Sequence, residues 1–198
     1  MGGSVTLAKQ FSGSWIHAIE EVIFADGTVW QASTLRDRQM ATVVVTSGND
    51  SIEGFDHGGE TLSGGLGADT LRGYSGSDTY LYAAGDGADR IEEAGARANI
   101  DRLRLIGIRA SDVNLSRSGS DAVLRFTMGG SVTLVNQLSS DGFHGVEEII
   151  FADDTIVRSA QLVQAMSQFG SSTSGVPLLS VVSPTQHTSN SSIAPSSG

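Results

Sequence analysis

Five acidic residues recur at nearly even intervals across residues 48–91, and their side chains could bind a metal ion. Each is followed two positions later by an apolar or aromatic residue. The acids are Asp50, Glu60, Asp69, Asp78 and Asp89, and the residues that follow them are Ile52, Leu62, Leu71, Tyr80 and Ile91. Carboxylate and backbone carbonyl oxygens are the ligands that calcium prefers, roughly six to eight at flexible geometry. This ladder therefore predicts a calcium-binding segment.

The two most regular units of the ladder are residues 64–72 and 73–81, which follow each other with a period of nine. Each unit begins with a glycine-containing turn, in which positive φ and close backbone approach let carbonyl groups converge. A short strand follows, and we expect Leu71 or Tyr80 to point inward while the aspartate stays in the turn. This nonapeptide is a known sequence pattern of calcium-binding parallel β-helices.

The ladder resembles the repeats-in-toxin (RTX) family of haemolysin-type calcium-binding proteins. The resemblance implies that two nonapeptides form one coil of a parallel β-roll, with ions between successive turns on the same edge. The implied ligands are Asp50, Asp69 and Asp89 on one edge and Glu60 and Asp78 on the other. Turn carbonyls complete the sites in this family, and the matching residues are Gly65, Gly67, Gly76 and Gly87.

The outer turns depart from the nine-residue period. Asp50 and Glu60 are ten residues apart, and Asp78 and Asp89 are eleven apart. Asp86 offers an additional oxygen ligand in the last of these turns. An alternative is a Gly/Ser/Asp-rich linker or a set of hairpin turns, because glycine and aspartate are common in any turn. A linker does not require an apolar residue at a fixed place after every acid, which favours the ladder.

Composition favours a turn-rich all-β chain. The 198 residues include 25 glycines and are 39% hydrophobic, 6% aromatic and 17% charged, which suits strands and turns better than a helical bundle. The formal net charge is −10, and residues 49–93 contain ten acidic residues against two arginines. Because these carboxylates repel one another, we expect the segment to fold only when calcium binds. With no cysteine in the chain, calcium would take the stabilising place of disulfides.

Charge and hydropathy bear on partners and location. A pI near 4.6 argues against nucleic acid, and no apolar run approaches the ~18 residues of a membrane span. A Sec-type signal is not present in the first residues. The RTX resemblance implies export by the type I secretion machinery, which reads a C-terminal signal, and hence an extracellular protein.

A long internal repeat brackets the ladder. Residues 1–35 and 128–162 align without a gap and are identical at about half of their positions. Both copies resemble the haemolysin-type calcium-binding related segment that flanks RTX repeats. Their offset of 127 residues indicates that the chain starts with the tail of a preceding unit and is a piece of a longer protein.

We therefore expect a parallel β-roll with β-rich capping segments at both ends. The four expected parts are an N-terminal cap (1–46), the calcium-binding roll (47–93), a β-rich flank and C-terminal cap (94–166), and a disordered Ser/Thr/Pro-rich tail with a candidate secretion signal (167–198). Further expected elements are a hairpin at 22–30 turning at Asp26 and Gly27, a short helix at 33–40, and strands at 103–105, 113–116 and 122–126.

The sequence predicts no enzyme. His17 and Glu20-Glu21 recur as His144 and Glu147-Glu148 in the second copy, and such repetition favours structural roles. The chain lacks the second histidine of a zinc protease helix, a Gly-x-Ser-x-Gly nucleophile turn and a phosphate-binding loop. The predicted function is a calcium-binding module at the C-terminal end of a larger secreted bacterial protein. The alternative is a calcium-dependent adhesin or carbohydrate-binding module that binds cell-surface polysaccharide, and a hydrolase is the third hypothesis.

Overall fold

The computed structural model describes residues 21–31, 45–55, 59–94, 99–139, 145–168 and 176–178. In these segments the chain is mostly strands, with one α-helix and one short 3-10 helix, η2 (Ala110–Asp112). The prediction of an all-β protein is confirmed. The helix expected at 33–40 lies outside the described residues.

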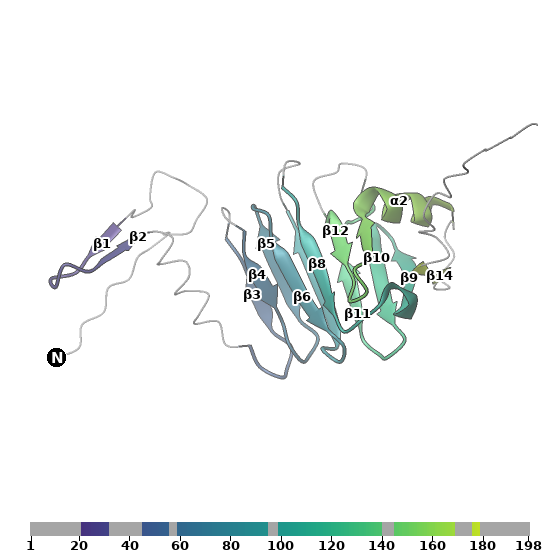
Figure 1. Cartoon of the computed structure of the whole chain (residues 1–198), viewed down its shortest axis with the longest axis horizontal. Coiled ribbons are helices and arrows are strands. Elements are labelled where there is room, and N and C mark those ends of the chain that lie inside the picture. The colour runs from purple at the N-terminus through teal and green to yellow at the C-terminus, as the bar shows by residue number, and fades with distance from the viewer. Residues whose placement is uncertain are drawn as a thin grey trace, which may run out of the picture.

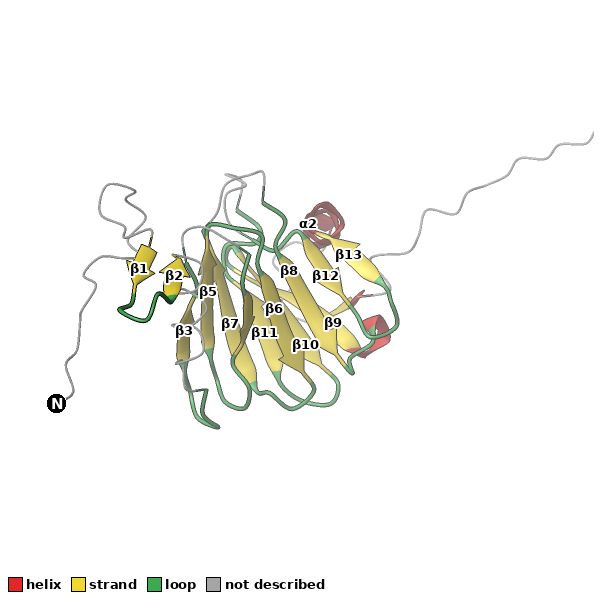
Figure 2. Ribbon diagram, turned by 60° about the vertical axis from the view of Figure 1, so that its left-hand side comes forward, coloured by secondary structure: helices red, strands yellow, loops and turns green. Residues whose placement is uncertain are grey.

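Two mixed sheets make up the body of the protein (Figures 1 and 2). The larger sheet contains, in spatial order, β14 (Val176–Pro177), β9 (Val113–Ser118), β10 (Asp121–Phe126), β11 (Ser131–Leu134), β7 (Ala88–Glu93), β5 (Thr70–Tyr74) and β3 (Ser51–Glu53). The smaller sheet contains β13 (Ile156–Arg158), β12 (Glu148–Ile150), β8 (Arg102–Ile106), β6 (Thr79–Ala83) and β4 (Thr61–Ser63).

From β3 to β8 the chain alternates between the two sheets, and neighbouring strands within each sheet are parallel. Thr70 of β5, for example, pairs with Ser51 of β3 on one side and with Arg90 of β7 on the other. Beyond β8, the successive strands β9, β10 and β11 are antiparallel neighbours in one sheet. Tight turns join these three strands, and such turns return the chain beside itself. The expectation of a purely parallel roll is therefore too simple, because both sheets end in antiparallel strands.

The core lies between the sheets and is supplied by the apolar residues that follow the acids. Ile52, Leu62, Leu71, Tyr80 and Ile91 are at most 3% exposed, and they belong to one continuous hydrophobic cluster. Their neighbours in the strands alternate with them and are more exposed, as the two-residue period of a strand requires. Each strand of a coil therefore adds one or two buried apolar or aromatic side chains to a narrow core.

The second repeat copy adds the last parallel strand to the stack of each sheet. Its strand β11 pairs in parallel with β7, and its strand β12 pairs in parallel with β8. The buried Gln137 side chain accepts from the Val146 N–H at 2.8 Å and donates to the Val146 carbonyl at 3.0 Å. This pair of hydrogen bonds holds the loop before β12 against the end of β11.

Two elements near the C-terminus differ from the sequence-based expectations. Helix α2 (Ser159–Gln168) was not predicted, although Leu162, Ala165 and Met166 are buried at helical spacing. Within the segment expected to be disordered, β14 pairs with β9 and Leu178 is buried.

The first repeat copy contributes a hairpin of β1 (Glu21–Ile23) and β2 (Val29–Gln31), which turns at Asp26 and Gly27 as predicted. Gly27 has a φ of +84°, a conformation that glycine adopts without strain. The hairpin forms a two-stranded sheet of its own and pairs with neither of the larger sheets in the described residues. Capping of this chain's roll by the first copy stays a prediction.

The narrow core makes stability sensitive to single inward residues. Leu103→Ala in β8, where the side chain is 0% exposed, is expected to cost about 2–5 kcal/mol of unfolding free energy. Ile106→Ala on the same strand, where the side chain is 48% exposed, should cost well under half as much. Urea unfolding at saturating calcium measures both, and equal losses would contradict the assigned core.

Candidate metal centre

The parallel strands pair in register, so the acidic residues that precede them form two columns. One column lies at the N-terminal ends of the parallel strands of each sheet. The column of the larger sheet contains Asp50, Asp69 and Asp89. The column of the smaller sheet contains Glu60, Asp78, Asp101 and Glu147. The structure thus brings together the acids that the RTX arrangement places on each edge, and it extends the second column by two acids. Their role as metal ligands stays a prediction.

Each column is held by hydrogen bonds from backbone to carboxylate. The N–H of every acid except the last in its column donates to the carboxylate of the next acid. The donor–acceptor pairs are Asp50 N to Asp69 Oδ1 (2.8 Å), Asp69 N to Asp89 Oδ1 (3.1 Å), Glu60 N to Asp78 Oδ1 (2.7 Å), Asp78 N to Asp101 Oδ1 (2.7 Å) and Asp101 N to Glu147 Oε2 (2.7 Å). One oxygen of each accepting carboxylate therefore fixes the preceding turn.

The second carboxylate oxygen of Asp69 and of Asp78 does not hold a backbone N–H. Asp69 Oδ2 and Asp78 Oδ2 are buried and accept no hydrogen bond within the described part of the chain. Their residues are 1% and 0% exposed. A buried, unpaired carboxylate oxygen is costly, and a bound cation is the usual way to offset that cost. These two atoms are the strongest structural indication of metal sites.

Glycines clear the space beside both oxygens. A Cβ added to Gly64 would collide with Asp69 Oδ2, and one added to Gly73 would collide with Asp78 Oδ2, the Tyr80 hydroxyl and Glu93. Any larger residue at these two places would fill the space beside the unpaired oxygens. The glycines of the nonapeptide are thus required for space as well as for turn geometry.

The predicted carbonyl ligands lie in the turns, but not all are equally available. Gly65 and Gly76 have positive φ and precede the aspartates of their turns. The Gly67 carbonyl accepts from Ala88 N at 3.1 Å, and the Gly87 carbonyl accepts from the Ser131 N–H at 2.8 Å. These two carbonyls already hold adjacent coils together.

Two of the predicted carboxylate ligands also have structural partners. Asp86 accepts from the Ala83 N–H at 2.7 Å and closes the turn between β6 and β7. Asp50, at the outer end of its column, accepts from the backbone and hydroxyl of Thr46. Both contacts engage carboxylate oxygens that the sequence assigned to calcium.

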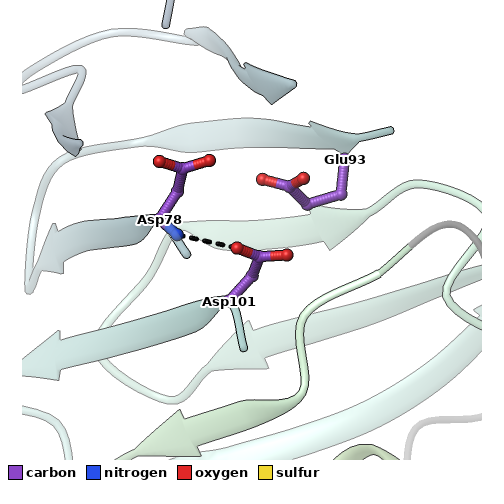
Figure 3. A group of neighbouring side chains, drawn as sticks. All are labelled: Asp78, Glu93 and Asp101. Atoms are coloured by element: carbon purple, nitrogen blue, oxygen red, sulfur yellow. Dashed lines mark hydrogen bonds between the residues drawn. The ribbon is translucent and has the colours of Figure 1, made fainter. Parts of the chain in front are cut away.

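Three carboxylates converge at the smaller sheet's column (Figure 3). Oxygens of Asp78, Glu93 and Asp101 lie within 4.8 Å of one another, and all three residues are buried. Glu93 reaches this place from the end of β7, a strand of the other sheet. The Tyr80 hydroxyl donates a hydrogen bond to Glu93 Oε1. Side chains from both sheets therefore line one potential cation site.

Without a bound cation, burial makes these carboxylates hold protons strongly. Burial, with the nearby charges of Asp101 and Asp78, raises the pKa of Glu93 to about 8. Burial raises the pKa of Asp101 to about 6 and that of Asp89 to about 6, each opposed by a backbone hydrogen bond. The pKa of Asp78 is raised for the same reason. The site favours either bound protons or a bound cation.

Sequence analysis missed Glu93, Asp101 and Glu147. For Asp101 and Glu147 a signal exists, because Leu103 and Ile149 follow them at the same two-residue spacing as in the ladder. Asp101 follows Asp89, the previous acid of the ladder, by 12 residues, and Glu147 follows Asp101 by 46 residues, so both lie outside a search for a period near nine. Glu93 has no such signal, since its place depends on the packing of one sheet against the other.

An all-β chain with stacked glycine turns and columns of buried carboxylates has the features of a calcium-binding repeat module. The residues fit calcium, because they supply only oxygen ligands and carry uncompensated negative charge. Residues 58–91 match the family model of the RTX calcium-binding nonapeptide repeat (4 copies), and residues 1–34 match that of the haemolysin-type calcium binding protein related domain.

The RTX resemblance is thus confirmed for these two segments, and calcium is the ion expected at the repeats. The match at residues 58–91 covers Glu60, Asp69, Asp78 and Asp89, whereas Asp101 and Glu147 lie beyond it. No curated protein matches the chain by sequence. None of the helices in the described segments is long and apolar enough to cross a membrane.

Without calcium, the free energy of unfolding should fall as the pH rises from about 4 to about 8. The ordinary pKa values of 4.5 for Glu93 and 3.8 for Asp101 rise to about 8 and about 6 in the folded chain. The folded state therefore binds more protons than the unfolded state in this window, so raising the pH removes stability. Calcium should reverse the trend, because it binds deprotonated carboxylates.

Far-UV circular dichroism in EDTA and in calcium, at about pH 5 and about pH 8, tests this pH dependence, and in EDTA the β signal should be larger at the lower pH. A β signal in EDTA that increases with pH would show that the acids are not proton-loaded in the folded state.

Proposed function

We propose that this protein is a calcium-binding RTX module that folds when calcium binds, after type I secretion, as the C-terminal part of a larger secreted bacterial protein. The observation that carries the calcium proposal is the pair of buried, unpaired oxygens, Asp69 Oδ2 and Asp78 Oδ2. Each lies in a column of acids whose other oxygens are used to hold the backbone. The family matches support calcium as the ion.

Each ion would lie beside a glycine-cleared oxygen and be shared between adjacent turns of one column. Asp69 and Asp89 are the side chains for the larger sheet's edge, with Asp50 at its outer end. Asp78 and Asp101 are those for the smaller sheet's edge, with Glu60 at its outer end. When bound, calcium supplies the positive charge that stacked carboxylates lack.

The coupling between binding and folding follows from the charge. Ten acids and two arginines occupy residues 49–93, so bringing the turns together without cations places like charges side by side. With a dissociation constant near 10⁻⁴ M and calcium near 10⁻³ M outside the cell, each site contributes about 1.4 kcal/mol. Three or four such sites would contribute about 4–6 kcal/mol, which rivals the whole stability of a typical domain.

That coupling would keep the segment unfolded where calcium is scarce and fold it after export. The extracellular location and the secretion route rest on the family resemblance. Binding of cell-surface polysaccharide is the alternative function, and a glycan array with and without calcium would test it.

Far-UV circular dichroism during a calcium titration tests the folding switch. Starting from EDTA-treated protein, calcium should produce a cooperative gain of β signal and magnesium should not, because magnesium demands stricter geometry and loses its water reluctantly. Asp69→Asn combined with Asp78→Asn should raise the calcium midpoint by at least about tenfold. Asp154→Asn, in an exposed turn outside both columns, is the matched control.

An unchanged midpoint in the double variant would remove these aspartates from the ligand set. An identical β spectrum in EDTA and in calcium would show that the fold does not depend on the metal.

Glu93 provides a separate test of the three-carboxylate cluster. Glu93→Gln keeps the side-chain length and an oxygen that can accept from Tyr80, but it removes one charge. Isothermal titration calorimetry should show one calcium fewer, or one site weakened by about tenfold. The control is Glu92→Gln, next in sequence, whose carboxylate instead accepts from Arg72 Nε at 2.7 Å on the outer surface. Equal binding by both variants would exclude Glu93 as a ligand.

A further inference from the structure

The hairpins of the two repeat copies have the same internal structure. In copy one, Glu21, Val22 and Ile23 pair with Gln31, Trp30 and Val29, and in copy two Glu148, Ile149 and Ile150 pair with Arg158, Val157 and Ile156. Each register matches the other at the 127-residue offset. The same turn closes both, since the Asp26 carboxylate accepts from Thr28 N at 2.9 Å and the Asp153 carboxylate accepts from Thr155 N at 3.2 Å.

Their surroundings are different. In copy two, Phe151 is 2% exposed, and Ile149 and Val157 are each 1% exposed. In copy one, the equivalent Phe24 is 37% exposed, and Val22 and Trp30, the equivalents of Ile149 and Val157, are only partly buried. Strand β12 pairs with β13 on one side and β8 on the other, whereas β1 pairs only with β2 in the described residues. The same apolar face is thus more exposed in copy one than in copy two, and within the described residues β1 lacks the second neighbour that β12 has.

Copy two shows which strand lies along the edge of the hairpin. Glu147 accepts the Asp101 N–H at 2.7 Å and so ends the acid column, while Glu148 accepts from Arg102 Nε at 3.2 Å. Ile149 lies in register with Leu103 of β8. Strand β8, with which β12 pairs, therefore has an acid, an arginine and an apolar residue in succession at its start. Copy one keeps the complementary residues in the same order, as Glu20, Glu21 and Val22.

The rest of the cap is also retained in copy one. Four positions that are buried in copy two outside its hairpin keep an apolar residue or the glutamine. These positions are Val132, Leu134, Gln137 and Val146, which correspond to Val5, Leu7, Gln10 and Ile19. A segment that served only as a linker would not need this set.

We propose that the first repeat copy is the end cap of a second calcium-binding roll, and that β1 pairs in parallel with the last strand of that roll. The occupant of the β1 edge, which pairs with no second strand of the described residues, is an end coil of the same kind as β8, in which an acid and an arginine precede an apolar residue. This chain's own β8 is already paired with β12, so the partner is a different roll. The inference concerns an interaction surface and does not rest on the calcium-coupled folding or secretion proposed above.

Disulfide trapping in the full chain tests this pairing. The chain has no cysteine, so an introduced pair reports one contact. Ile149→Asp should detach β12 and leave β8 open as a model of the partner's end coil. Glu21→Cys and Arg102→Cys then lie in register, at the Cα separation of adjacent strands, which suits a disulfide. The bond between positions 21 and 102, within one molecule or between two, should form at least about tenfold faster than when Ile149 is intact.

The control is the off-register pair Glu21→Cys and Arg104→Cys in the Ile149→Asp background. It should cross-link no faster than the pair at positions 21 and 102 does when Ile149 is intact. An Ile149→Asp protein that keeps its β signal but forms no bond between positions 21 and 102 overturns the proposal. Equal cross-linking of the two pairs overturns it as well.

A chimera covers the case in which Ile149→Asp fails to fold. Residues 128–162 are replaced by the sequence of residues 1–35, which preserves the chain length. If copy one can cap a roll, the chimera should show the wild-type β signal under the same conditions, with a urea midpoint within about 20% of the wild-type value. A chimera without that β signal, beside a folded wild type, overturns the proposal. The wild-type calcium titration, run in parallel, reports separately on the proposed calcium function.

Discussion

The structure depends on a double use of each central carboxylate. One oxygen accepts the backbone N–H of the acid one coil earlier, which sets the register of the parallel strands. The other oxygen, at Asp69 and Asp78, is buried beside a glycine without a hydrogen-bond partner in the described chain. The carboxylates that order the turns with one oxygen therefore leave a second, buried oxygen without a partner in the described chain. Calcium fits this need because it accepts many oxygen ligands at flexible geometry.

Each column of acids ends where an apolar residue or an ion pair replaces the next uncompensated carboxylate. In the larger sheet, β11 follows β7 with Val132 opposite Asp89, so a buried apolar residue takes the place of the next acid. In the smaller sheet the column ends at Glu147, and the neighbouring Glu148 pairs with Arg102. Beyond these points the chain adds antiparallel strands and helix α2, which close the core with apolar contacts. Strands β11 and β12 of the second repeat copy thus lie between the parallel strands that carry the acid columns and the antiparallel strands and helix, whose contacts with the core are apolar.

Several features were predictable because they depend on short-range spacing. The acid ladder, the inward residues two positions later and the turn at Asp26 and Gly27 each involve residues close together in sequence. The two additional column acids were not found, because Asp101 follows Asp89 by 12 residues rather than nine, and Glu147 lies 46 residues beyond Asp101. Helix α2 was missed although Leu162 and Met166 have helical spacing, and β14 was missed because two residues carry no pattern of their own.

The amino-acid sequence by itself determined the nonapeptide turns, the oxygen-donor chemistry of their side chains and the existence of two related segments. These follow from glycine conformation, carboxylate chemistry and repetition, all of which can be read along the chain. Only the tertiary structure decided that Glu93 lies beside Asp78 and Asp101, that the second column continues to Glu147, and that the hairpin of the second copy is more buried than that of the first. Such facts depend on which strands are neighbours across the sheets, and that choice is made by burial of the shared core rather than by any single segment.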